Sequence, residues 1–413
     1  MAGKRVLLLS AYDAYSHQLW RTTLVDMFPQ INWTVLSLPP RYFAWRVRGN
    51  SLSWAFNHRD QLTDNYDMVL ATSLTDLSAL RGFVPELAQL PAMVYFHENQ
   101  FAYPENRGPE NRGPENRRPE NRRPESQQPE GETVARVQAQ LTSLYTALCA
   151  DQVLFNSDWN RRSFFTGAGQ LLAKLPDHVP GNLLAELQNK SQVLAVPLAD
   201  QLFRETQRTA QWTRAAEEPV NIVWNHRHEY DKGPALLLSI VNRLCDRGVA
   251  FRLHLLGQRF RSSPVEFDSI RSRLQQHYQD RGISPGVDEW VSDRQTYQAL
   301  LAQSDIVLST AEHDFQGLSV LEASILGCLP AVPDALAYPE YFASHFRYEV
   351  GELDHDGIAL AAAELIHRLA VERVSDLPVS PPELQSLSAS ALRPAWASAL
   401  LATIKRHKHN NSK

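Results

Sequence analysis

Two carboxylates and two cations in the C-terminal half have the types and spacing to bind a phosphorylated sugar. The stretch DFQGLSVLE holds Asp314 and Glu322 with seven residues between them, around a Gly-Leu-Ser that begins an apolar helical pattern. In NHRHEYDKGP, Arg227 and Lys232 lie five residues apart in a loop between a predicted strand and a helix entered at Pro234. Cations and the open amides of helix starts both favour anions. The two segments therefore predict a diphosphate site.

The two carboxylates admit more than one interpretation. Near the first helical turn, Glu322 can accept two vicinal hydroxyls of a ribose, and Asp314 can accept sugar hydroxyls. Alternatively, Glu322 only stabilises the helix dipole, and Asp314, Arg227 and Lys232 are solvated loop charges. A glycosidase would need both carboxyls at the scissile bond with a defined separation, which a glutamate at a helix start does not provide. The sequence also lacks GxGxxG and GxxxxGK[ST], so a nicotinamide dehydrogenase or P-loop interpretation has no support.

Polar side chains in the N-terminal half follow apolar runs of strand length. His97, Glu98 and Asn99 come directly after PAMVYF, so they are predicted at the carboxyl edge of a sheet. There Glu98 can accept a proton from an acceptor hydroxyl or orient it, whereas a lone His at a strand end is often structural. Further candidates for the same edge are Ser16 and His17 in the first strand-to-helix loop, and Asn156 and Ser157, for which helix capping is the alternative.

Arginines alternate with aromatic residues in RYFAWRVRGNSLSWAFNHR. Cations for phosphates and rings for unstacked bases are what recognition of a single-stranded RNA loop requires. The alternative is an amphipathic core segment whose arginines extend along an apolar surface. The residues concerned are Arg41, Tyr42, Phe43, Trp45, Arg46, Arg48, Trp54 and Arg59.

Composition limits the class of protein. The 413 residues, 43% hydrophobic and 21% charged, predict a globular chain of about two domains. A net charge of -5 argues against a general nucleic-acid binder and leaves only a local basic patch. No apolar run reaches the roughly 18 to 20 residues of a membrane span, so we expect a cytoplasmic protein. Three widely spaced cysteines, Cys149, Cys245 and Cys328, predict core residues without a disulfide or metal site.

Strand-like and helix-like runs alternate along both halves of the chain. KRVLLLSAY, NWTVLSLP, YDMVLATS and PAMVYF are strand-like, and VNIVW, FRLHLLG, DEWVSD, DIVLST and CLPAVPDA repeat the alternation. This order predicts an α/β fold of two parallel-sheet lobes, with ligands at the carboxyl edges of the strands and a cleft between the lobes. The predicted segments are lobe 1–200, a disordered PENR-repeat insertion 104–130, a linker 201–217, lobe 218–380, and a C-terminal helix with a basic tail 381–413.

These motifs resemble a known family. Arg227 with Lys232, a strand ending at Gly257 and two acids before LEAS resemble the donor lobe of retaining GT-B glycosyltransferases, although the first acid is usually Glu there and is Asp314 here. SH at 16–17, RYFAWRVRG, YFHENQ, FNSDWNR, WNHRHEYDKGP and AEHDFQGLSVLEA resemble, more narrowly, the tRNA-queuosine mannosyltransferases of this fold. The resemblance covers most of the chain except the PENR repeat.

The resemblance implies a GT-B fold of two Rossmann-like lobes, and transfer of mannose with retention from GDP-mannose to the cyclopentenediol of queuosine in the anticodon loop of tRNA-Asp. No metal, membrane or obligate protein partner is expected. Catalytic roles are expected for His97, Glu98, Arg227, Lys232 and Asp314. Donor contacts are expected from Arg227, Lys232, Gly257, Val291, Asp314, Gln316, Gly317, Leu318, Ser319 and Glu322, and acceptor or RNA contacts from Ser16, His17, Arg41, Trp45, Arg46, Arg48, Asn99, Gln100 and Asn156.

Two alternatives stay open from the sequence. One is a GT-B transferase acting on a lipid or small-molecule acceptor, which an exposed amphipathic acceptor surface would favour. The other is a sugar-nucleotide or RNA-binding module without turnover, which Asp314 in the place of Glu would favour.

Overall fold

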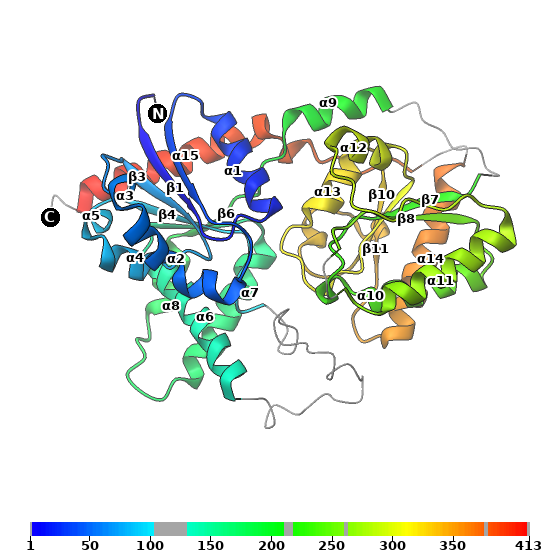
Figure 1. Ribbon diagram of the computed structural model, residues 1–413, viewed down its shortest axis with the longest axis horizontal. Helices are drawn as coiled ribbons and strands as arrows, with labels where there is room; N and C mark the ends of the chain where they lie inside the picture. The colour runs from blue at the N-terminus through cyan, green and yellow to red at the C-terminus, as the bar shows by residue number, and fades with distance from the viewer. Residues whose placement is uncertain (1, 103–129, 210–217, 260–262, 376–378, 411–413) are drawn as a thin grey trace. The chain divides into compact units, whose positions relative to one another are not determined.

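A sheet of six parallel strands forms the centre of the first of two units in the computed structural model (Figure 1). The structure describes residues 2–102, 130–209, 218–259, 263–375 and 379–410. The inner strands are buried on both faces, as continuous apolar runs in a parallel sheet require. The strand order is β2-β1-β3-β4-β5-β6, with β1 Arg5–Ser10, β2 Asn32–Ser37, β3 Met68–Thr72, β4 Ala92–Phe96, β5 Gln152–Phe155 and β6 Ser191–Val193.

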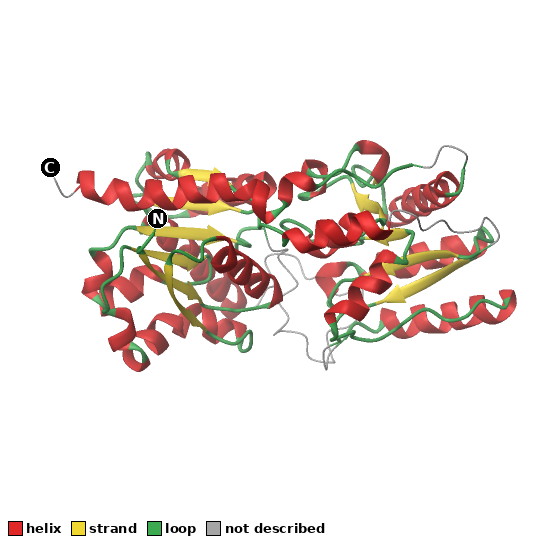
Figure 2. Cartoon of the chain, turned by 90° about the horizontal axis from the view of Figure 1, so that it is seen from above, coloured by secondary structure: helices red, strands yellow, loops and turns green. Residues whose placement is uncertain are grey.

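Helices pack on both faces of this sheet (Figures 1 and 2). The C-terminal helix α15 contacts α1 and β4, and its Trp396 is buried beside Trp20 and Tyr95. On the other face α2, α4, α6 and α7 bury the main apolar core. The helices are α1 Tyr15–Met27, α2 Phe43–Asn57, α3 Arg59–Leu62, α4 Leu77–Phe83, α5 Pro85–Ala88, α6 Glu130–Leu148, α7 Asp158–Lys174, α8 Leu183–Asn189 and α15 Ala389–Asn410.

The second unit contains five parallel strands in the order β11-β10-β9-β7-β8. From β8 onward this order, second-first-third-fourth-fifth, repeats that of the first five strands of the first unit. In such sheets the crossovers run in opposite directions from two neighbouring strands, and ligands bind where they diverge. That point lies between β1 and β3 in one unit and between β7 and β9 in the other. The strands are β7 Val220–Trp224, β8 Phe251–Leu255, β9 Ile306–Leu308, β10 Leu329–Pro333 and β11 Arg347–Tyr348.

Helices of the second unit pack in groups. Helix α14 contacts α10 and the strands β9 to β11, while α13 contacts α9, α12 and β9. The helices are α9 Asp200–Thr209, α10 Pro234–Asp246, α11 Glu266–Arg281, α12 Arg294–Ala302, α13 Leu318–Ile325 and α14 His355–Arg373. No helix within the described ranges is long and apolar enough to cross a membrane.

The predicted class, α/β with two parallel sheets, is confirmed. The predicted strand DEWVSD is wrong: only Asp288 forms an isolated bridge, with Leu255. The chain divides into Met1–Leu198 with Ala389–Lys413 and Ala199–Ser388, so the C-terminal helix belongs to the first unit. Helix α9 occupies the start of the segment expected as a linker. The repeat at 104–129 lies outside the described residues, and Glu130 begins α6.

Candidate functional site

The loops after β7 and β9 bring an ammonium and a carboxylate together at the divergence point of the second sheet. Lys232 Nζ lies 3.9 Å from Asp314 Oδ2 and 3.3 Å from Asp231 Oδ2. It also donates a 2.6 Å hydrogen bond to the carbonyl of His313. Burial acts to lower the pKa of Lys232, but Asp231 and Asp314 raise it above its usual value. The site therefore holds one permanent positive charge in a fixed position.

Close backbone packing fixes the loop that carries Lys232. The Lys232 carbonyl accepts a 2.7 Å hydrogen bond from Thr310 Oγ1, which itself accepts one of 2.9 Å from Trp224 Nε1. Gly233 has φ 64° and caps α10, and a Cβ there would lie 2.0 Å from the Thr310 carbonyl oxygen. Only glycine allows this approach of the two loops. Gly257 serves similarly at the end of β8, since its Cβ would lie 1.5 Å from the His226 carbonyl oxygen.

Asp314 is hydrogen-bonded to the start of helix α13. Its Oδ1 accepts a 2.9 Å bond from the Gly317 amide, and its Oδ2 accepts a 3.2 Å bond from the Tyr338 hydroxyl. Burial would raise the pKa of Asp314, but Lys232 and the Gly317 amide help to hold it below its usual value. Asp314 is therefore ionised at neutral pH. Since Gly317 is the N-cap, the amides that follow it in the first turn have no partner within the helix.

Glu322 differs from its predicted setting. It lies in the second turn of α13, and its side chain is only 7% exposed. Both Nη atoms of Arg294 pair with its two carboxylate oxygens. Burial raises the pKa of Glu322, and the Arg294 guanidinium opposes that rise. Glu322 was predicted near the first helical turn with its carboxylate available to a ribose, but it lies in the second turn and that carboxylate pairs with Arg294.

Two residues that pair with predicted site residues in this unit, Arg294 and Asn225, were not predicted from the sequence. Arg294, the first residue of α12, follows the cap Asp293, whose carboxylate accepts the Thr296 amide at 2.8 Å. That D-x-x-T pattern was a readable signal for the helix start, although not for the partner of Arg294. Asn225 Nδ2 donates 2.9 Å to the Ser319 carbonyl and 3.0 Å to the Tyr297 hydroxyl. It thus joins the end of β7 to the start of α13.

The remaining predicted donor residues have varied surroundings. Arg227 is half exposed and pairs with Glu229 at 2.9 Å. Val291 is half-buried in the segment before α12, while Gln316 is buried beside Gly317 and Leu318 is half-buried. Lys232, Asp314 and Gly317 are thus brought together, whereas Arg227 forms its ion pair within its own loop.

In the first unit, His97 lies in an aromatic cluster after β4. Its ring centroid is 4.1 Å from His17, 4.8 Å from Trp20 and 4.7 Å from Tyr95. Burial, followed by the proximity of His17, holds the pKa of His97 well below its usual value. Asn156 Nδ2 donates 2.9 Å to the His97 carbonyl. His97 is therefore a neutral imidazole on a fixed backbone, and its Nε2 has no hydrogen-bond partner in the described part of the chain.

The predicted acceptor residue Asn99 is committed to the protein itself. Its Nδ2 donates to Asn160 Oδ1 at 2.8 Å and to Ser163 Oγ at 2.9 Å. Its Oδ1 accepts the amides of Phe101 and Ala102, both at 3.0 Å. These bonds join the loop after β4 to helix α7. Of its sequence neighbours, Glu98 is half-buried and Gln100 is buried. Near the chain start, Ser16 Oγ lies 3.4 Å from His17 Nδ1.

The arginine-aromatic segment, residues 41–59, contains the whole of α2. Arg41, Trp45 and Arg48 are exposed, and Trp45 is 51% exposed. Arg46 instead is buried and donates from Nε to the Pro39 carbonyl at 3.2 Å. The two predicted roles are thus divided: three residues face outward, as RNA contact would require, and Arg46 lies against the protein.

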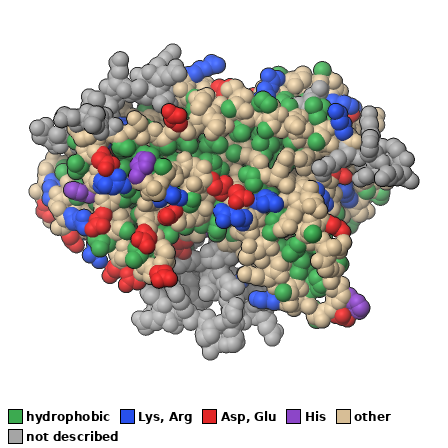
Figure 3. Space-filling model, turned by 180° about the vertical axis from the view of Figure 1, so that it is seen from behind, with side chains coloured by type: hydrophobic (Ala, Val, Ile, Leu, Met, Phe, Trp, Pro, Cys, Tyr) green, Lys and Arg blue, Asp and Glu red, His purple; other side chains and the backbone are tan. Residues whose placement is uncertain are grey.

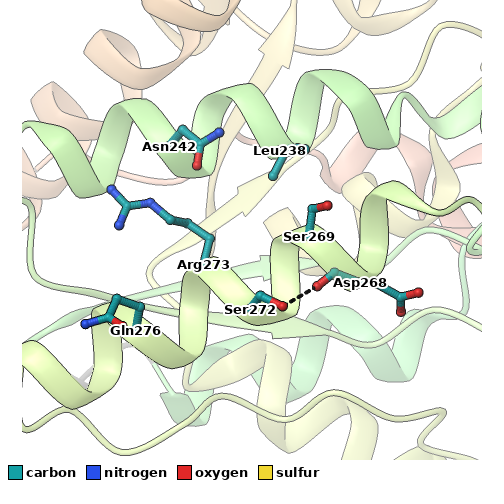
Figure 4. Close-up of a pocket in the computed structure, with 7 residues that line it drawn as sticks. All are labelled: Leu238, Asn242, Asp268, Ser269, Ser272, Arg273 and Gln276. Atoms are coloured by element: carbon teal, nitrogen blue, oxygen red, sulfur yellow. Dashed lines mark hydrogen bonds between the residues drawn. The ribbon is translucent and has the colours of Figure 1, made fainter.

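The surface shows mixed charge on one face and a groove in the second unit. On the face in Figure 3, basic and acidic side chains are interspersed. A groove of about 550 Å³ lies between α10 and α11 (Figure 4) and contains none of the predicted site residues. The groove is lined by Leu238, Asn242, Asp268, Ser269, Ser272, Arg273 and Gln276. Separately, the described ranges contain no group of three or more His, Cys, Asp or Glu residues that could hold a metal ion.

Comparisons with known proteins agree with this architecture. Residues 5–198 match the family model described as tRNA-queuosine alpha-mannosyltransferase N-terminal. The chain is 29% identical over 352 residues to a Drosophila melanogaster tRNA-queuosine alpha-mannosyltransferase, covering 84% of each protein.

Solved structures with little sequence identity share the fold. An α,α-trehalose-phosphate synthase (UDP-forming) from Burkholderia vietnamiensis superposes with a TM-score of 0.58 at 13% identity, over 97% of this chain and 99% of that one. Anabaena Alr3699/HepE in complex with UDP gives a TM-score of 0.51 at 12% identity, over 99% of both chains. The fold is that of the GT-B enzymes. Its N-terminal part matches the tRNA-queuosine alpha-mannosyltransferase model, and most of its length is similar to the Drosophila enzyme; these similarities identify the chain as a glycosyltransferase.

Proposed function

We propose that this glycosyltransferase moves mannose from GDP-mannose to the cyclopentenediol of queuosine in the anticodon loop of tRNA-Asp. Similarity to the Drosophila tRNA-queuosine alpha-mannosyltransferase supports tRNA-bound queuosine as acceptor and mannose as the sugar. The observation that carries the proposal is the fixed ammonium of Lys232 beside the start of α13. A nucleotide sugar needs its diphosphate neutralised as it leaves, and this arrangement supplies charge and amides at one point.

We assign the donor to the second unit because, at the corresponding divergence point of the first unit, the charged side chains pair with each other. After β1, Asp13 accepts hydrogen bonds from Arg21 Nε at 3.1 Å, Arg21 Nη2 at 2.9 Å and Ser10 Oγ at 2.9 Å. Arg21 therefore forms an ion pair inside the protein. Lys232 in the second unit also has carboxylate neighbours, but the first-turn amides of α13 follow the same loop after β9 that carries Asp314. This difference favours the second unit as the diphosphate site.

The proposed reaction proceeds on one face of the sugar. The bond from the anomeric carbon to the diphosphate oxygen breaks, and a bond to the acceptor hydroxyl oxygen forms on the same side. The acceptor proton passes to the departing phosphate oxygen. Lys232 and the α13 amides stabilise the growing negative charge in place of a metal ion. His97 is neutral, its Nε2 has no partner in the described ranges, and it is proposed to hydrogen-bond a substrate hydroxyl.

The test is incubation of the full chain with GDP-mannose and queuosine-containing tRNA, followed by mass spectrometry of the digested nucleosides. The expected result is a hexose on queuosine, removed by an α-mannosidase and not by a β-mannosidase. The same tRNA lacking queuosine is the matched control, UDP-glucose tests the donor, and EDTA tests the metal-free step. No hexose with any tRNA would refute the acceptor, and a product sensitive to β-mannosidase would refute retention.

A further inference from the structure

Four buried polar atoms near the carboxyl ends of β3 and β4 have no hydrogen-bond partner among the residues that the structure describes. The residues that carry them are between 0% and 8% exposed. Within the described residues, no donor or acceptor reaches any of the four atoms. They are Ser73 Oγ, Thr75 Oγ1, Gln100 Nε2 and Ser143 Oγ.

Helix α6 brings these residues together. Thr146 Oγ1 donates a 2.7 Å bond to the Thr75 carbonyl, in the loop after β3. Gln140 Nε2 donates a 3.4 Å bond to the Gln100 carbonyl, in the loop after β4. Ser143 is three residues from each, and residues three apart share one face of a helix. Its hydroxyl therefore lies on the face of α6 that spans the two loops.

Ser73 lies at the same edge of the sheet. Its amide donates 3.0 Å to the Tyr95 carbonyl, which places it beside the last residues of β4. Neighbouring polar groups are satisfied: Asn50 Nδ2 donates 3.0 Å to the Leu74 carbonyl, and Asn50 Oδ1 accepts the Asp76 amide at 3.0 Å. Buried polar atoms are almost always paired, so four open ones around two loops are an exception that requires an explanation.

We propose that these four atoms form the subsite that hydrogen-bonds the polar edge of the acceptor nucleoside, and this rests on the proposed function. A nucleoside with hydroxyl and amine groups offers both donors and acceptors, and recognition of an unstacked base in an RNA loop uses such contacts. Paired with substrate groups, the three hydroxyls and the amide would no longer be buried without partners. The four atoms are enclosed in this structure, so a ligand reaches them by displacing neighbouring side chains.

Helix α2 connects this subsite to an exposed aromatic face. Asn50 joins α2 to the loop after β3. Trp45, Arg48, Leu52 and Phe56 recur at helical spacing on α2 and are all exposed. Rings and cations of this kind stack on bases and contact phosphates. One helix thus presents a stacking face to solvent and supports the loop that carries Ser73 and Thr75.

The decisive variant is Ser143→Ala in the full chain, with Thr142→Val as control. Thr142 is the adjacent residue on α6, and its hydroxyl bonds the Gln138 carbonyl at 2.9 Å. Ser143→Ala is expected to raise KM for queuosine-containing tRNA about three- to tenfold, the effect of one hydrogen bond. KM for GDP-mannose should stay unchanged, and Tm should be unchanged or higher because an unpaired buried hydroxyl is removed. Ser73→Ala should act in the same way.

The outcomes separate the possible roles. An unchanged KM for tRNA in both serine variants would overturn the proposal. In that case, a raised Tm would show that the hydroxyls are unpaired in a dry interior. An unchanged Tm would show that ordered water fills the sites. A rise in both KM values with a lower Tm would also overturn it, because it would indicate a purely structural role. Absence of transfer by the wild-type protein would refute the proposed function itself, which is a separate result.

Discussion

The ammonium of Lys232 lies 3.9 Å from the carboxylate of Asp314, although the two residues come from loops after different strands. The loops follow β7 and β9, which are neighbours in the sheet. Asp314 in turn accepts a hydrogen bond from the amide of Gly317, the N-cap of α13. The relationship therefore links a fixed cation to a helix N-terminus through one carboxylate, and it supports the placement of the diphosphate.

Replacing Lys232 by Met keeps the aliphatic stem and removes the charge. We expect kcat to fall by about 100-fold or more, the usual effect of losing one preorganised charge-stabilising group. Steady-state transfer assays would measure it, with Arg243→Met on α10 as a control for loss of a surface cation. Activity of Lys232→Met within threefold of wild type would contradict the assignment of the diphosphate to this loop.

Removing the Glu322 carboxylate should reduce stability before anything else. Glu322→Ala leaves Arg294 without its bidentate partner, and a cost of roughly 2–3 kcal/mol is expected, below that of a fully buried pair because Arg294 is partly exposed. Urea unfolding would measure it. The double variant Glu322→Ala/Arg294→Ala should cost less than the sum of the single changes. Strict additivity would show that the pair contributes no coupling.

Gly317 and Gly3 form a natural matched pair, because both have φ 73°. A Cβ at Gly317 would lie 2.7 Å from the Tyr338 ring, whereas one at Gly3 meets nothing within 4 Å. Gly3→Ala should cost about 1 kcal/mol from backbone strain alone, and Gly317→Ala should cost more and also slow transfer. Thermal unfolding and transfer assays test this. An equal loss of stability from the two changes would mean that the Tyr338 ring moves aside at no cost.

The structure separates two arginines that the sequence grouped. Arg48→Ala should weaken tRNA binding regardless of tRNA sequence. It should also make the slope of log binding constant against log salt concentration shallower by roughly one, as expected for the loss of one phosphate contact. Arg46→Ala should instead lower the free energy of unfolding by about 1–2 kcal/mol, because it loses buried packing and the bond to Pro39. Filter binding at several salt concentrations distinguishes them. Equal loss of RNA affinity in both would contradict the division.

Acid should destabilise the protein before its carboxylates titrate. Burial lowers the pKa of His226 and of His313 from 6.5 to about 4, so each is neutral in the folded chain. Between these values the unfolded chain binds more protons, and stability is lost as pH falls from about 6.5 toward 4. Burial raises the pKa of Glu322, so this group contributes in the opposite direction: its stabilising effect is present at low pH and is lost as pH rises through its folded-state pKa.

Urea unfolding at pH 7, 5.5 and 4.5 checks this expectation. His226→Gln should flatten the slope between pH 6.5 and 4, whereas His367→Gln at an exposed position of α14 should not. A pH-independent midpoint in the wild-type protein over this range would contradict the buried neutral histidines.

Several features were readable from the sequence because they depend on local patterns. Continuous apolar runs such as AMVYF predicted buried parallel strands, since both faces of such a strand are covered. The polar residues after those runs were placed at the carboxyl edge because all strands point the same way. His97 is therefore found directly after β4, where it was predicted.

Partners and burial were decided only by tertiary structure. Arg46 and Arg48 stand two positions apart on one helix, yet one is buried and the other exposed, because their directions relative to the sheet differ. Glu322 lies inward and pairs with Arg294, which no local pattern connects to it. DEWVSD has strand-like composition but finds only one bridging residue. The hydrophobic pattern predicts each strand or helix and the residues at its end. The pairing of charges depends on the crossovers, because these bring loops that are distant in sequence together.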